Sequence, residues 1–205
     1  MQIRKISESD LEQRVKWMNN PKVYKTMHFV PPISLENTKR WYEGNRNNAN
    51  RFDAAFIDDE GALLAFGGLT NIDYSVRKAE FYIFVNPEMQ GKGIGTKATY
   101  LLLKYGFEVL QLHKVYLFTN ASNTGAKKTY EKVGFKLEGI HREENIIDEK
   151  YEDRLYYGFL AKDFDSGKEE LKLAGWSDVQ MDECKVDDLN IKLVRDDTYP
   201  QIGGV

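Results

Sequence analysis

The chain has 205 residues, of which 41% are hydrophobic and 30% charged, with a net charge of −3 and one cysteine, Cys184. This composition is typical of a globular protein with a packed core, and it excludes a membrane-spanning helix, a secretory signal and a disulfide framework. The acidic balance and three scattered histidines argue against nucleic acid and metal as partners, so we expect a cytoplasmic protein.

The first third of the chain alternates between helical and strand-like periodicity. Leu11, Val15 and Met18 recur at helical spacing, and Ser34 is a natural N-cap before a second helix. The turn sequence DDEG at 58–61 separates two apolar runs and predicts a β-hairpin. We therefore expect a strand at 2–6, helices at 7–20 and 31–44, and strands at 51–57 and 62–72.

The middle of the chain reads as strand–helix–strand units. A run of aromatic and β-branched residues predicts a strand, and Gly134 marks the end of a helix. We expect strands at 78–85 and 114–120, helices at 96–110 and 123–133, and closing strands at 134–140 and 153–160. Early helices, a meander of strands and then strand–helix–strand units predict an α+β or mixed α/β sheet domain.

The charge is unevenly distributed along the chain. Residues 166–205 contain 5 Lys or Arg and 9 Asp or Glu, a net charge of −4, which leaves the preceding part near neutral. We place a boundary in the sequence DSGKEE, at residues 165–170. The predicted domain covers residues 1–164, and an acidic extension covers residues 165–205.

A glycine-rich stretch, NPEMQGKGIGTKA, occupies residues 86–98 between a predicted strand and a predicted helix. A helix N-terminus presents unpaired N–H groups, and glycine lets a phosphate approach them closely. A P-loop needs Ser or Thr after its Gly-Lys pair, and here Gly93 follows. The dinucleotide fingerprint needs an acid after the next strand, which here ends in Asn120. The pattern Q-x-x-G-x-G is met by Gln90, Gly93 and Gly95.

Two motifs at this spacing resemble those of the GNAT superfamily of acyl-CoA-dependent N-acetyltransferases. Residues 85–98 resemble its pyrophosphate-binding signature, in the required strand–turn–helix context. Residues 117–135 resemble its strand–Asn-x-x-Ala-x-x-x-Tyr–helix–Gly-Phe segment. The resemblance covers about residues 1–162 and implies a central, mostly antiparallel sheet that is splayed in the middle and flanked by helices. The positions matching the second motif are Asn123, Ala126, Tyr130, Gly134 and Phe135.

The resemblance implies that acetyl-CoA is the acyl donor, while the single cysteine and the scattered histidines predict no metal site. The diphosphate of acetyl-CoA would lie on N–H groups of the glycine turn, with Lys92 or Lys97 adding charge unless both are ordinary solvated lysines. Its pantetheine arm would pair with the preceding strand. Asn123 would contact the cofactor near the thioester, or else only cap its helix. The implied cofactor-binding residues are Phe84, Val85, Gln90, Gly91, Lys92, Gly93, Ile94, Gly95, Thr96, Asn123 and Ala126.

Two side chains are candidates for the proton transfers. The family pattern gives Tyr130 the role of general acid toward the departing sulfur, and the alternative is a core aromatic residue of its helix. A base must deprotonate the attacking amine, and the resemblance suggests Glu80, acting directly or through a water. Strand alternation puts Glu80 on one face with Tyr82 and Phe84. The alternative is a surface carboxylate at a strand end.

Residues 15–43 and 134–160 bear on the amine acceptor. Together they resemble the GNAT branch that contains nucleotide-linked amino-sugar acetyltransferases, with ribosomal-protein and polyamine acetyltransferases as close relatives. We therefore expect a nucleotide-linked amino sugar as acceptor. Lys25, His28 and Arg142 are the candidate contacts to its diphosphate or sugar, and each is otherwise a surface polar residue.

Three alternatives stay open. A polyamine acceptor predicts an acidic pocket, and the run at 143–153 supplies six carboxylates, although such a run is usually a solvated loop. A ribosomal N-terminal peptide is the second alternative. A non-catalytic acyl-CoA-binding module is the third, and the presence of both Glu80 and Tyr130 argues against it.

The end of the chain has a resemblance of its own. Residues 192–204 resemble the opening of pyridoxal-phosphate enzymes of the cysteine desulfhydrase and aminocyclopropane-carboxylate deaminase type. The catalytic lysine and nearly all of that fold are missing, so we infer no pyridoxal chemistry. The extension is either the start of a truncated second module or a segment that packs on the domain or on the partner subunit of a homodimer.

Overall fold

The computed structural model describes residues 1–27, 29–147 and 149–164. Within them the strands form one sheet in the order β1-β2-β3-β4-β5-β7-β6. Neighbouring strands are antiparallel, except that β4 and β5 are parallel. The predicted α+β class with a mostly antiparallel sheet is confirmed. The strands are β1 (Gln2–Lys5), β2 (Phe52–Ile57), β3 (Leu63–Asp73), β4 (Lys78–Val85), β5 (Lys114–Asn120), β6 (Lys136–Ile147) and β7 (Lys150–Leu160).

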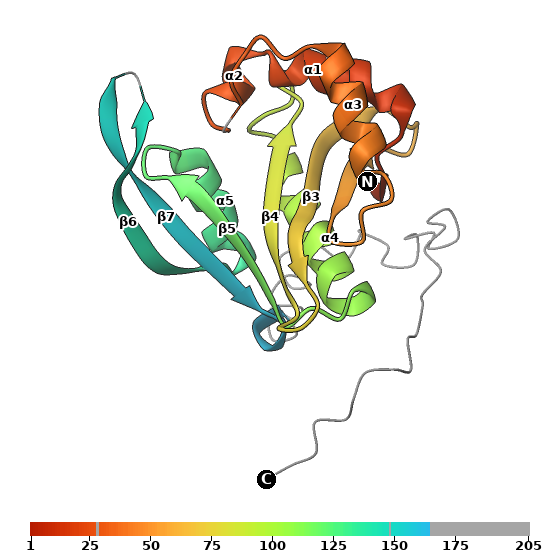
Figure 1. Ribbon diagram of the computed structural model, residues 1–205. Helices are drawn as coiled ribbons and strands as arrows, with labels where there is room; N and C mark the ends of the chain where they lie inside the picture. Colours follow the sequence, from red (N-terminus) through yellow and green to blue (C-terminus); the bar gives the residue numbers. More distant parts are fainter. Residues whose placement is uncertain (28, 148, 165–205) are drawn as a thin grey trace.

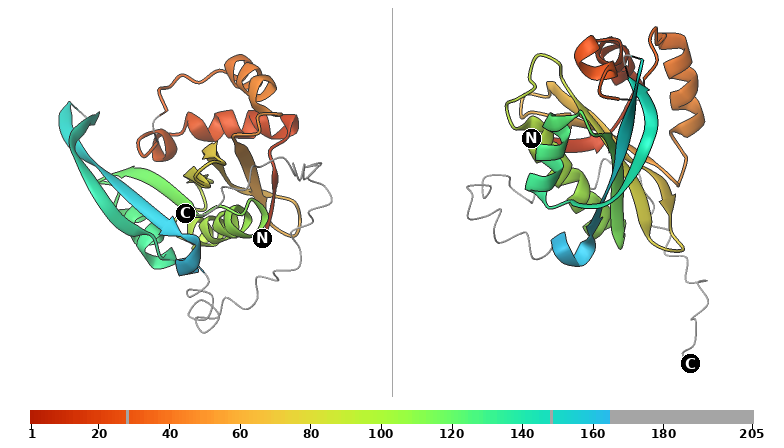
Figure 2. Two further views of the ribbon diagram at one scale, coloured as in Figure 1. Left: turned by 60° about the horizontal axis from the view of Figure 1, so that its bottom comes forward. Right: turned by 90° about the vertical axis from the view of Figure 1, so that its left-hand side faces the viewer.

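Helices cover both faces of this sheet (Figures 1 and 2). A short 3-10 turn, η1 (Glu8–Asp10), and the helices α1 (Leu11–Met18), α2 (Pro21–Tyr24) and α3 (Leu35–Asn45) lie over one face. The other face is covered by α4 (Ile94–Lys104), its continuation η2 (Tyr105–Val109) and α5 (Thr124–Val133). The short helix α2 was not predicted; Pro21 begins it and the Asn20 side chain caps it by accepting from Lys22 N at 3.0 Å.

The side chains of β4 divide between two cores, one on each face. Phe81 is buried among residues of α4, α5 and β5. Phe84 is buried with Trp17, Val23 and other residues of the N-terminal helices. The predicted alternation of β4 is therefore confirmed, and the strand is held firmly from both sides.

Local signals account for most element boundaries. Ser34 Oγ accepts from Asn37 N at 3.1 Å and begins α3, and Gly134 ends α5 with a φ of 117°. The helix predicted over 96–110 departs from expectation, because its α-helical part ends at Lys104 and a π-helical turn follows. Gly106 lies in that turn, where a Cβ atom would be 3.0 Å from Leu69 Cδ1, so glycine lets the widened turn pack closely on β3.

The acidic run at 143–153 was expected to be a solvated loop, and this expectation was wrong. Its described residues, 143–147 and 149–153, belong to the β6–β7 hairpin, where Asn145 pairs with Glu152 and Ile146 pairs with Tyr151. Its side chains are largely solvated all the same, because β6 is an edge strand and charged residues are well suited to an exposed edge.

The acidic extension at 165–205, with its resemblance to pyridoxal-phosphate enzymes, lies outside the described residues, and the boundary placed before it stays a prediction. In the part of the chain that the structure describes, none of the helices has the length and apolarity needed to cross a membrane.

Candidate active site

A cleft opens where β4 and β5 separate. The two strands pair only from Lys78 with Lys114 to Glu80 with Tyr116, and beyond that point they diverge (Figure 1). The cleft between them has a volume of about 600 Å³. Because β5 no longer pairs with it, the far half of β4 presents free backbone groups to the cleft, which an extended ligand can use as an added strand.

The glycine turn closes one end of this cleft. Gly91 and Gly93 line it with φ values of 79° and 81°, a left-handed conformation that disfavours any residue with a Cβ. Gly93 is the N-cap of α4, so the first N–H groups of that helix have no partners within the helix. The Gln90 side chain donates to Lys22 O at 3.4 Å and ties the turn to α2. The result is a fixed backbone cradle suited to a phosphate group.

The opposite wall of the cleft begins at α5. The Asn123 side-chain oxygen accepts from Ala126 N at 3.2 Å and caps the helix, while its NH₂ group is left to donate to a ligand. Tyr130, two turns further on, lines the same cleft. Its ring packs edge-on against Phe81 with centroids 5.9 Å apart, and burial raises the pKa of Tyr130. A phenol in this setting stays protonated at neutral pH and can donate a proton.

Glu80 lies at the vertex of the cleft, as the last residue of β4 that pairs with β5. Its Oε2 accepts from Asn71 Nδ2 at 2.8 Å. Tyr116 faces it from β5, and the pKa of Tyr116 is raised by burial first and then by the charge of Glu80. An extended ligand that lay along β4 would end near this vertex. The Glu80 carboxylate could therefore contact a second molecule that met the end of that ligand.

Aromatic rings cover the neighbouring face of β5 and β7. The Phe118 and Tyr156 rings are 5.1 Å apart, and Tyr116 is 5.6 Å from Tyr156. Two cations already lie on these rings: Arg154 over Phe118 at 4.2 Å and Lys114 over Tyr156 at 5.2 Å. The aromatic face, Tyr116, Phe118 and Tyr156, therefore offers π surfaces that attract cations.

Comparison with known proteins was decisive for the family. Residues 1–136, well over half of the chain, match the acetyltransferase (GNAT) domain family. The chain belongs to this family. The resemblance expected from the two motifs is confirmed.

Several similar proteins in this family are named for spermidine. Spermidine N(1)-acetyltransferase of Vibrio cholerae is 32% identical over 158 residues, which is 75% of this chain and 90% of that protein. The enzyme of that name from Escherichia coli (strain K12) is 37% identical over 99 residues, 48% of this chain, so the chain matches only 53% of the length of that relative. A crystal structure of spermidine N-acetyltransferase from Vibrio cholerae in complex with CoA and spermine has a TM-score of 0.76 at 29% identity, covering 79% of this chain and 96% of the other.

Most residues predicted from the GNAT motifs meet at the cleft. Those that line it are Glu80, Phe84, Val85, Gln90, Gly91, Gly93, Gly95, Thr96, Asn123, Ala126 and Tyr130. Ile94 does not, because its side chain is buried in the core beneath the turn, with 8% exposure. Lys92 is exposed and outside the lining.

Of the residues predicted to contact the acceptor, the two that the structure describes are not found in the cleft lining. Lys25 at the end of α2 and Arg142 on the edge strand β6 are exposed and lie outside the cleft lining. His28 lies outside the described residues. The charged residues that do line the cleft, besides Glu80, are Lys22, Lys128, Lys132 and Arg154.

These missed residues differ in how visible they are in the sequence. Lys128 and Lys132 are four residues apart on α5, so helical spacing predicts that they share one face of the helix. It does not place them on the face of Asn123, from which they are five and nine residues away. Arg154 becomes a cleft residue only because β7 pairs beside β5, with Asn120 opposite it. No local sequence pattern predicts the register between β7 and β5.

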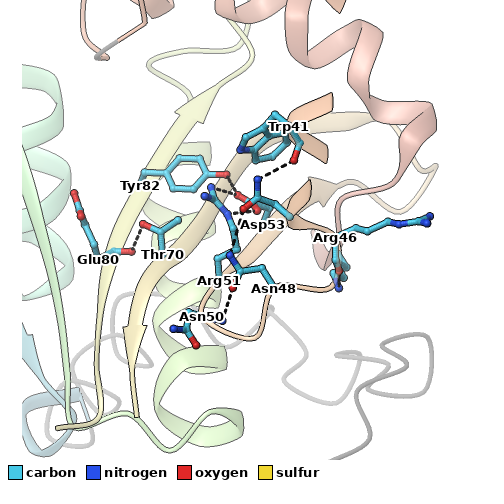
Figure 3. A network of polar contacts seen from close by, with 11 residues as sticks. Trp41, Arg46, Asn48, Asn50, Arg51, Asp53, Thr70, Glu80 and Tyr82 are labelled. Carbon is cyan, nitrogen blue, oxygen red and sulfur yellow. Dashed lines mark hydrogen bonds and ion pairs between the residues drawn. The ribbon is translucent and has the colours of Figure 1, made fainter. Parts of the chain in front are cut away.

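A buried polar network fixes the β4 wall from behind (Figure 3). The Tyr82 hydroxyl donates to Asp53 Oδ1 at 2.5 Å, and Arg51 Nε donates to Asp53 Oδ2 at 2.7 Å. The Tyr82 ring packs over Gly68, where a Cβ atom would lie 2.5 Å from Tyr82 Cε1. Burial, reinforced by the Asp53 charge, raises the pKa of Tyr82. The Glu80 side chain points away from this network and takes no part in it (Figure 3).

Proposed function

We propose that this GNAT family member transfers the acetyl group of acetyl-CoA to a primary amine of a polyamine of the spermidine class. The observation that carries the proposal is the cleft itself. It runs between the diverging strands β4 and β5, with a glycine cradle at one end and the Glu80 carboxylate at its vertex.

The donor fits the residues present. The backbone at Gly91 and Gly93 is shaped for the diphosphate, and Lys128 and Lys132 add positive charge on the α5 side. The unpaired length of β4 suits the amide-bearing pantetheine arm, which would hydrogen-bond to it as a short strand. The thioester would then lie near Tyr130.

The chemistry follows from two side chains. Glu80 accepts a proton from the ammonium group of the acceptor, so the nitrogen lone pair becomes available. The amine nitrogen forms a bond to the acetyl carbonyl carbon, the carbon–sulfur bond breaks, and Tyr130 donates its proton to the departing sulfur. The acylated nitrogen loses its extra proton, and that proton restores the Tyr130 phenol, so the products are the neutral amide and the CoA thiol. Burial raises the pKa of Tyr130, so the protonated phenol is available as the acid throughout the neutral range.

The acceptor assignment departs from the amino sugar that the sequence suggested. The similar proteins named for spermidine support the polyamine alternative instead. Lys25 and Arg142, expected to hold a nucleotide diphosphate, lie outside the cleft lining. A carboxylate beside an aromatic face suits an ammonium group.

The direct test is a thiol-release assay with purified protein and acetyl-CoA. Spermidine, a UDP-linked 4-amino sugar and ribosomal N-terminal peptides are compared as acceptors at equal concentration. We expect CoA release with spermidine above all. Turnover of only the sugar or only the peptides would overturn the polyamine assignment. Binding of acetyl-CoA without release of CoA in the presence of any of these amines would identify a non-catalytic acyl-CoA-binding module.

A further inference from the structure

A bulge in β3 turns one side chain toward the vertex of the cleft. Pairing with β4 is regular as far as Thr70 opposite Glu80 and resumes only at Asp73 opposite Lys78. Asn71 lies in this bulge with a φ of 50°, in the left-handed region that few residues other than glycine adopt. Bulges of this kind commonly re-aim a side chain beside an active site.

The bulge exchanges the faces of two neighbouring residues. In a regular strand Asn71 would share the core face with Leu69, and Ile72 would point the other way. Instead Ile72 is buried in the core with Leu69, and Asn71 is exposed. Asn71 therefore reaches across to Glu80, and its Nδ2 donates to Glu80 Oε2 at 2.8 Å.

We propose that Asn71 is a positioning residue for Glu80; this rests on the proposed function, in which Glu80 is the base. Its amide holds one carboxylate oxygen, so the other oxygen is directed to the amine. A neutral donor does this without adding a positive charge that would repel the ammonium group of the acceptor.

Other titratable and charged groups surround the vertex and set the background for this effect. Tyr116 faces Glu80 from β5, and Lys78 with its partner Asp73 lies one step along the β3–β4 pair. Lys22 and Arg154 contribute charge from α2 and β7 elsewhere in the lining. All of them are unchanged in the variants below, so a shift between variants reports the contact at residue 71.

Two substitutions separate the contact from the backbone. Asn71→Gly keeps the left-handed conformation and removes the amide; we expect kcat with spermidine to fall about fivefold. Asn71→Asp keeps the shape and puts a like charge beside Glu80. We expect the acid limb of the kcat/KM profile to move up by about one pH unit. The matched control is Gln111→Gly, which changes another left-handed residue outside the cleft lining and should leave both quantities unchanged.

A second readout does not depend on turnover. The side-chain carboxyl of Glu80 is followed by NMR in protein labelled with carbon-13 glutamate, with Glu80→Gln to assign the signal. In Asn71→Asp the midpoint of that titration should rise in step with the acid limb. Unchanged midpoints and pH profiles in both Asn71 variants would overturn the inference, as would an equal shift in Gln111→Gly.

The two proposals fail in different ways. If the wild-type protein acetylates none of the amines, the proposed function is wrong, and the titration alone decides whether Asn71 controls the charge of Glu80. If the wild-type protein acetylates spermidine while the Asn71 variants keep the wild-type profile and midpoint, only the positioning role is wrong.

Discussion

The two walls of the cleft are built in different ways. The proposed donor wall, residues 84–96, is one continuous stretch that offers mainly backbone features: free strand groups, two left-handed glycines and a helix N-terminus. The proposed acceptor wall, Phe118 and Arg154 with the rings packed on them, consists of side chains from separate strands. Glu80 and Tyr130 lie where the walls meet.

This difference decides how each wall responds to substitution. A backbone site tolerates change in most side chains but not in the glycines that set its φ angles. A side-chain site keeps its shape through strand pairing while its ligand preference follows single residues. Variants should therefore separate cleanly into those that affect the donor, those that affect the acceptor, and those that affect the chemical step.

The largest effect is expected at the junction, from Tyr130→Phe. Loss of the general acid should lower kcat by about 10²- to 10⁴-fold, with little change in either KM because the ring and its packing remain. The measurement is steady-state kinetics at saturating acetyl-CoA, with thermal unfolding as the control for folding. A wild-type kcat would remove Tyr130 from the mechanism and leave it as a core residue of α5.

Glu80→Gln should have the next largest effect. The amide can still accept a hydrogen bond from Asn71 but cannot take a proton, so kcat should fall about 10- to 10²-fold, with water as the weaker base. The acid limb of the kcat profile should also disappear. If kcat falls but the acid limb persists at its original pH, another group is the base and Glu80 only binds the acceptor.

The same contrast explains how far the sequence could predict this molecule. Most of the donor wall could be predicted because its signal is contiguous, although the predicted Lys92 and Ile94 do not line the cleft. The helix caps at Ser34 and Asn123 were visible because their signals are also local. Arg154 was missed because it reaches the cleft through the pairing of β7 with β5. Asn71 was missed because a bulge reverses the face that strand alternation assigns to it.

Gly93→Ala tests the donor wall alone. The left-handed φ of 81° costs a residue with a Cβ about 1–2 kcal/mol, so the KM for acetyl-CoA should rise about tenfold while the KM for spermidine stays constant. Gly61→Ala is the matched control, since Gly61 has a φ of 83°, open space around it and a position in the β2–β3 turn. It should lower thermal stability without changing either KM. Equal KM values for wild-type and Gly93→Ala proteins would show that the cradle relaxes freely.

Phe118→Leu should give the smallest effect, and it tests the acceptor wall alone. Leucine keeps an apolar side chain but removes the π face on which a cation can lie, a contribution of about 0.5–1 kcal/mol at an exposed site. The KM for spermidine should rise about three- to fivefold, and the KM for acetyl-CoA should not change.

The control for this variant is Tyr151→Leu, which removes a ring that is 70% exposed at the tip of the β6–β7 hairpin, outside the cleft lining. Its kinetics should match the wild type. If Phe118→Leu instead raised the KM for acetyl-CoA, the ring would belong to the donor site, and the division of the cleft into a backbone wall and a side-chain wall would be wrong at this point. An acceptor effect alone would place the polyamine on the aromatic face, with the amine that reacts held at Glu80.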